Sequence, residues 1–150
     1  KDPMEPGQTT AKPDLRGLFH FMAQLYTHKI LTQKIMHYCI LGHRQRAEKT
    51  ESEEEAEESV ESICILLATV GEGMEMKNRK TDIYYSEIPG YYNWLHDIAE
   101  GRARKETKDA GGRTAPGPII QVSPSVKSAI SSLINLRNAG WKKIPAHTGH

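Results

Sequence analysis

The stretch from Leu15 to Cys39 constrains the fold most, because two amphipathic helical patterns follow each other there with almost no chain between them. The first pattern places apolar residues at three- and four-residue steps, which puts them on one face of a helix: Leu15, Leu18, Phe19, Met22, Leu25 and Tyr26. The second pattern has the same spacing in Leu31, Ile35, Met36, Cys39 and Ile40. The joint Thr27-His28-Lys29 is too short for a strand or a wide loop. It predicts a tight turn that folds the second helix back on the first as an antiparallel pair with an apolar seam.

Periodicity and capping residues predict five helices in the chain. Ser123-Pro124 is a strong start signal, since serine caps a helix and proline fits its first turn. Gly71 and Gly140 are glycines of the kind that ends a helix. The predicted helices run from about Pro13 to Thr27, from Leu31 to His43, from Glu54 to Val70, from Tyr91 to Ala103, and from Ser123 up to Gly140.

Nine positions on the inward stripes of these helices are expected to form one core: Leu18, Met22, Leu25, Ile35, Cys39, Ile63, Leu67, Ile130 and Leu133. The tyrosine-rich stretch 84–98 has two interpretations. It can pack as core and rim, or it can stack nucleic acid bases. The glutamate run 48–58 can be a solvated loop or an acidic docking surface.

Several segments lack apolar positions and are expected to be mobile, because ordering them would cost more entropy than their contacts return. Residues 1–12 are interpreted as a disordered tail or a cloning remnant, and 144–150 as a flexible tail. Residues 44–53 are expected to be a charged break between helices, and residues 107–118, which contain GGRTAPGP, an exposed loop. The helical domain is then expected to span 13–143.

Composition and motifs exclude some function classes. The net charge of +1 gives no global argument for nucleic acid binding, so any basic site must be local. The longest apolar run, Ile63 to Val70, is too short to cross a bilayer, so no membrane partner is expected. Phosphate-binding loops, dinucleotide fingerprints and nucleophile elbows are absent, and Cys39 and Cys64 lack the spacing of zinc ligands. We therefore expect no cofactor, no metal and no enzymatic activity.

Four segments resemble the middle domain of eukaryotic translation initiation factor 4 gamma. They are FMAQLY (21–26), ILTQKIMHYCI (30–40), ESICILLATVG (61–71) and LRNAGW (136–141), and they occur in the order of the family. The first helix departs from the family pattern at Ala23 and Gln24. The resemblance implies an all-α fold, namely a HEAT-like α-solenoid of antiparallel helix pairs, of which this chain would be a divergent, C-terminal part.

The resemblance also implies a function. A chain of this kind would be a cytoplasmic translation initiation scaffold that binds the DEAD-box RNA helicase initiation factor 4A and helps to join mRNA to the small ribosomal subunit. The closing tryptophan of the family belongs to the helicase-binding surface. This carries over to Trp141, with Arg137, Lys142 and Lys143 as its partner-binding neighbours. We expect Trp141 to project from the domain as an interface anchor.

Two alternatives remain open. The chain can belong to the same superfamily but act in mRNA decay or splicing with another helicase. It can instead be a helical module that binds RNA directly through local basic residues, for which the candidates are Arg102, Arg104, Lys105, Lys108 and Arg113.

Overall fold

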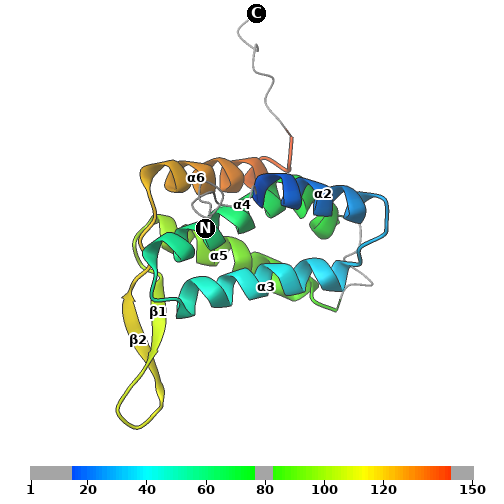
Figure 1. Cartoon of the computed structure of the whole chain (residues 1–150). Coiled ribbons are helices and arrows are strands. Elements are labelled where there is room, and N and C mark those ends of the chain that lie inside the picture. The colour runs from blue at the N-terminus through cyan, green and yellow to red at the C-terminus, as the bar shows by residue number, and fades with distance from the viewer. Residues whose placement is uncertain (1–14, 77–82, 143–150) are drawn as a thin grey trace, which may run out of the picture.

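The chain is mostly helical in a computed structural model that describes residues 15–76 and 83–142 (Figure 1). The tails expected at 1–12 and 144–150, and Lys143, lie outside the described residues. The elements in chain order are α2 (Leu15–Thr27), α3 (Gln33–Lys49), α4 (Glu53–Met76), the short 3-10 helix η1 (Tyr85–Glu87), α5 (Ile88–Ala99), β1 (Arg104–Lys108), β2 (Thr114–Ile119) and α6 (Pro124–Asn138). The helical class is confirmed in outline, but a two-stranded sheet is added to it.

The long helix α4 is the element against which the others pack. Both α2 and α3 make their extensive contacts with α4, and α6 packs on α4 and α5 (Figure 1). The first two helices do run in opposite directions, since the Phe19 ring meets the His43 ring at one end and Tyr26 donates a hydrogen bond to Gln33 at the other. The apolar seam expected directly between α2 and α3 is instead formed mainly where each of the two helices packs on α4.

The turn between α2 and α3 closes in a Schellman motif. The Ile30 N–H donates to the Leu25 carbonyl at 2.8 Å, and the Lys29 N–H donates to the Tyr26 carbonyl at 2.9 Å. Lys29 takes the left-handed position of this motif, with φ of 65°, where glycine is usual. The next helix starts at once, because the Thr32 side chain accepts a hydrogen bond from the Ile35 N–H.

The prediction that residues 44–53 form a mobile break between helices is wrong for most of this segment. Helix α3 continues to Lys49 and buries Ala47, so that only 50–52 separate it from α4. The glutamates of the acidic run begin α4, where carboxylates favour the positive end of the helix dipole. Ser52 provides a cap by accepting a hydrogen bond from the Glu55 N–H. The glutamate run therefore starts a helix.

Two further boundaries differ from the expectation. Helix α4 does not end at Gly71 but runs through it to Met76, because α6 packs closely against this part of α4. Helix α5 starts at Ile88 rather than Tyr91, since Pro89 occupies its first turn, where a missing N–H leaves no hydrogen bond unmade.

The loop expected at 107–118 is part of an antiparallel β-hairpin that extends away from the helices (Figure 1). Asp109 organises its tip: its carboxylate accepts hydrogen bonds from the N–H groups of Gly111 and Arg113. Pro116 lies opposite Glu106. Hydrogen-bonded and non-hydrogen-bonded pairs alternate along an antiparallel ladder, and Asp109 and Arg113 form a hydrogen-bonded pair. Counting back from that pair, the backbone nitrogen of Pro116 points away from β1. Proline is therefore tolerated there.

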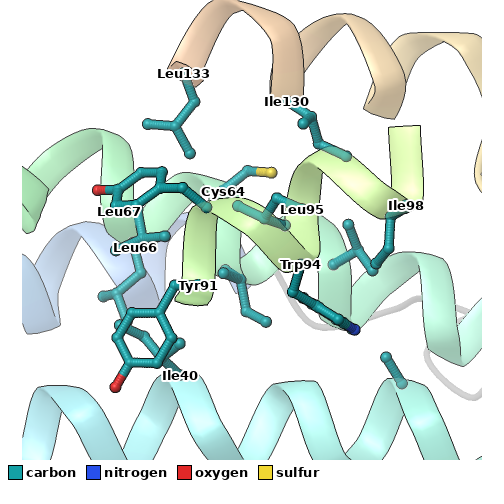
Figure 2. Close-up of a cluster of buried hydrophobic side chains, with 14 of the residues drawn as sticks. Ile40, Cys64, Leu66, Leu67, Tyr91, Trp94, Leu95, Ile98, Ile130 and Leu133 are labelled. Atoms are coloured by element: carbon teal, nitrogen blue, oxygen red, sulfur yellow. The ribbon is translucent and has the colours of Figure 1, made fainter. Parts of the chain in front are cut away.

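The core lies where α3, α4, α5 and α6 converge (Figure 2). Ile63, Leu67, Ile130 and Leu133 are buried, as predicted from their stripes. Met22, Leu25 and Cys39 are half-buried.

The burial predicted for Leu18 and Ile35 is wrong, because they are 50% and 40% exposed. Helix α2 instead turns Phe19 and Ala23 inward, and α3 turns Met36, His37 and Ile40 inward. Both α2 and α3 have apolar residues on two adjacent faces, and the face that is buried is the one that packs against α4. In the described part of the chain, no helix is both long and apolar enough to cross a membrane.

Candidate partner-binding site

Five residues from three separate segments of the chain meet where the end of α4 lies beside the end of α6. We call this set, Gly71, Glu75, Tyr92, Arg137 and Trp141, the α4–α6 junction. Arg137 binds Glu75 through two nitrogens: Nε lies 3.0 Å from both carboxylate oxygens, and Nη2 lies 2.6 Å from Oε2. The Trp141 indole N–H donates to the same carboxylate at 3.1 Å. A bidentate, charge-assisted contact of this kind fixes geometry as well as adding stability.

The end of α6 aims Trp141 at this carboxylate. Gly140 is left-handed, with φ of 74°, and the Trp141 N–H donates to the Leu136 carbonyl at 2.9 Å, which completes a Schellman motif. Trp141 is itself left-handed, with φ of 68°, an uncommon conformation for a large side chain. The prediction that Gly140 follows the last helix in a left-handed conformation is confirmed.

Gly71 provides the space for the indole ring. A Cβ atom at this position would lie 2.6 Å from the Trp141 ring and 2.7 Å from the Tyr92 hydroxyl oxygen, closer than real Cβ atoms approach other atoms. Tyr92 meets the indole ring edge-on, and the Arg137 guanidinium lies over the Tyr92 ring at 4.3 Å. Because Gly71 has no side chain, the Trp141 ring can lie directly against the backbone of α4.

The charge state of the junction is stable around neutral pH. The hydrogen bonds that Arg137 donates to Glu75 raise the pKa of the guanidinium above its ordinary value. Burial raises the pKa of Tyr92, the Glu75 charge raises it further, and Arg137 opposes both. The guanidinium therefore stays charged and the phenol stays neutral in the physiological range.

The expectation that Trp141 projects outward is wrong. Its side chain is 8% exposed and packs against its own domain. Arg137 is also engaged within the domain, because Glu75 is its partner. Lys142 is exposed beside the junction, and Lys143 lies outside the described residues. A partner-binding role for these four residues stays a prediction, now with Trp141 and Arg137 acting from inside.

The five basic residues expected to bind RNA do not form one surface. Strand alternation places Lys105 on the opposite face of β1 from Arg104 and Lys108, and Lys105 is buried. Arg102 pairs with Asp97 at 2.9 Å and lies 3.7 Å from Glu100. The candidate basic face of the hairpin is therefore smaller than predicted: Arg104 and Lys108 are exposed on one face of β1, and Arg113 is exposed at the tip, opposite Asp109.

Two features were not predicted as sites. The first is His37, which is fully buried and shares a hydrogen bond with the Tyr91 hydroxyl at 2.5 Å. The second is a groove of about 990 Å³ at the α2–α3 turn, bordered by the end of α4 and by Tyr84. Within residues 15–76 and 83–142, no three His, Cys, Asp or Glu side chains gather in a way that could hold a metal ion.

Comparison with known proteins points to one kind of relative. The chain is 23% identical to human eukaryotic translation initiation factor 4 gamma 3 over 148 residues, or 99% of this chain and 7% of that protein. It is 23% identical to mouse eukaryotic translation initiation factor 4 gamma 1 over 141 residues, or 94% of this chain and 7% of that protein. It is 31% identical to melon (Cucumis melo) eukaryotic translation initiation factor 4G over 105 residues, or 67% of this chain and 5% of that protein.

The chain is similar to initiation factor 4 gamma over most of its length. It spans less than a tenth of the length of these relatives. No family model matches the chain, and no solved structure matches it.

The four segments that resemble initiation factor 4 gamma lie at the main contacts of the fold. FMAQLY lies in the second half of α2. ILTQKIMHYCI covers residues 30–32 before α3 and the first half of α3, and ESICILLATVG forms the middle of α4, on which both helices pack. LRNAGW holds the arginine and tryptophan of the α4–α6 junction. The Glu75 that binds both lies just beyond the third segment. No motif marked it, and only a helix continuing through Gly71 would have placed it near α6.

Proposed function

We propose that this chain is part of a cytoplasmic translation initiation scaffold of the 4 gamma type, without catalytic activity of its own, and that it binds the DEAD-box helicase initiation factor 4A. The observation that carries the proposal is similarity to 4 gamma proteins over 99% of the chain. The helices would then be a partial HEAT-like stack, in which α4 packs against α2, α3 and α6.

The α4–α6 junction supports a binding surface at the end of α6. Glu75 holds Arg137 and Trp141 together, which fixes the direction in which the chain leaves the helix. Lys142 is the exposed cation at this point. In this proposal the buried tryptophan positions the surface, and Lys142, followed in the sequence by Lys143, contacts acidic groups of the helicase.

Reversing the charge of Lys142 should weaken helicase binding without affecting the fold. We expect Lys142→Glu to raise the Kd for purified initiation factor 4A about tenfold, chiefly when salt is low, because rim charges act through long-range attraction. Isothermal titration at two salt concentrations measures this, and circular dichroism checks the fold.

The matched control is Lys127→Glu, which reverses an exposed lysine near the opposite end of α6. Equal effects of the two substitutions would place the surface elsewhere. Failure of the unaltered chain to bind the helicase, with or without RNA, would refute the function itself.

The second candidate function is direct RNA binding by the hairpin. Arg104, Lys108 and Arg113 are exposed on an element that extends away from the helices, where a phosphate backbone has access (Figure 1). If this is right, Arg104→Glu combined with Lys108→Glu should abolish salt-sensitive binding of oligouridine. Fluorescence anisotropy at several salt concentrations tests it, with Arg102→Glu, an arginine already paired with Asp97, as the control. Unchanged binding by the double variant would exclude the hairpin.

A further inference from the structure

The groove at the α2–α3 turn has the size and lining of a recognition site. Its volume of about 990 Å³ is at the upper end of the range of ligand pockets. Three elements build it: the end of α2 with its turn, the start of α3, and the last turns of α4. The lining is mixed: apolar and aromatic side chains such as Tyr26, Leu31, Met76 and Tyr84 alternate with polar and charged ones.

Exposed apolar side chains concentrate around this groove. Met76 and Ile83 line it and are 60% and 82% exposed, and Ile30, in the turn, is 65% exposed. Tyr38 is also exposed and meets the groove residue Tyr84 edge-on, with ring centres 6.1 Å apart. Large apolar groups gathered on a surface and bordered by polar ones mark sites that bind other proteins.

The charge on the border of the groove is predominantly positive. Lys29 and Lys34 line it, against one carboxylate, that of Glu72. Neither lysine takes part in an ion pair within the described part of the chain, and Lys34 lies with its amine 5.5 Å from the centre of the Tyr38 ring. Two cations beside an apolar surface complement a segment that carries both apolar and acidic side chains.

Lys29 adds an independent observation. It holds the left-handed position of the Schellman motif, with φ of 65°, where a glycine would fit without strain. The chain thus keeps a lysine at the mouth of the groove in a conformation that disfavours it. Strained backbone positions cluster at active sites and ligand-binding sites.

We propose that this groove binds an acidic, amphipathic segment of a protein partner, with an apolar side chain seated against Leu31, Met76 and Ile83 and carboxylates beside Lys29 and Lys34. The groove shares no residue with the α4–α6 junction, and its two lysines lie on the α2–α3 turn and on α3, which do not contribute to the junction. Leu31, Met76 and Ile83 add aliphatic side chains to the tyrosines of the groove, and aliphatic side chains pack against apolar residues of a peptide rather than stacking on bases.

The test uses a fluorescein-labelled helical peptide of about 15 residues, with leucine on one face and glutamate on the other. Fluorescence anisotropy should show saturable binding to the full chain that weakens roughly tenfold in Lys29→Glu/Lys34→Glu and in Ile30→Ser/Met76→Ser. These four side chains are exposed, so the fold should tolerate the changes, and circular dichroism verifies this. Phe21→Ser, an exposed apolar residue of α2 outside the groove, is the control and should bind normally.

Lys29→Gly separates binding from stability. It removes the left-handed strain, so it should raise the melting temperature by about 2–5 °C. It should also weaken binding of the acidic peptide several-fold, because the lysine amine is lost. A purely structural lysine would give the first change without the second. Equal binding by all variants, a preference for the same peptide with lysine in place of glutamate, or oligouridine binding that the same substitutions abolish would each overturn the proposal.

Discussion

Trp141→Ala is expected to lower the free energy of unfolding by about 3–5 kcal/mol, the range for deleting a buried large aromatic side chain. The indole ring fills the space above Gly71, contacts Tyr92 and donates its N–H to Glu75. Its loss leaves a cavity between α4 and α6 and removes one hydrogen bond from a half-buried carboxylate.

Urea denaturation followed by helical circular dichroism measures this change. Gly71→Ala tests the same contact from α4, since it adds one methyl group where the Trp141 ring now lies. Overpacking at that point should cost about 1–3 kcal/mol, less any gain from the helix preference of alanine. If Trp141→Ala leaves the denaturation midpoint unchanged, the ring does not pack against its own domain in solution.

The second large effect is expected for Leu67→Ala, which should cost about 2–5 kcal/mol. Leu67 is 1% exposed, in the part of α4 between the other helices (Figure 2). The close-packed surroundings cannot fully collapse onto the vacated space, so a cavity term adds to the lost burial.

Leu18→Ala provides the same chemical change at a leucine that is 50% exposed. It should alter the free energy of unfolding by less than about 1 kcal/mol, and comparing the two denaturation curves removes the contribution of side-chain type. Equal losses at the two positions would contradict the burial of α4 between its neighbours.

Sequence patterns predicted helices well where one apolar face and one capping signal agree. Helix α6 is the clearest case, because Ser123 caps it, Ile130 and Leu133 face inward and Gly140 follows its end. Patterns failed where a residue's usual role depends on its neighbours. Gly71 was interpreted as the end of a helix, whereas its missing side chain makes room for a tryptophan 70 residues later in the chain.

The candidate site was predictable only in part, for the same reason. Arg137 and Trp141 lie four residues apart and could be identified together from the sequence. Their common partner Glu75 is 62 residues from Arg137, so only the packing of α6 on α4 reveals that both side chains turn inward. The groove escaped notice because it is formed by three separate segments, none of which carries a motif for it.

The arrangement of the hairpin has a consequence for the behaviour of the chain at high concentration. A short sheet that extends from a helical body offers its outer strand to any other chain, which is a common start of aggregation. Here one side of the sheet is occupied, since β1 packs against α3. On the other side, Pro116 has no N–H to offer at the middle of β2. At the outer edge of β2, a neighbouring strand therefore finds no continuous row of donors to pair with, which disfavours strand addition there.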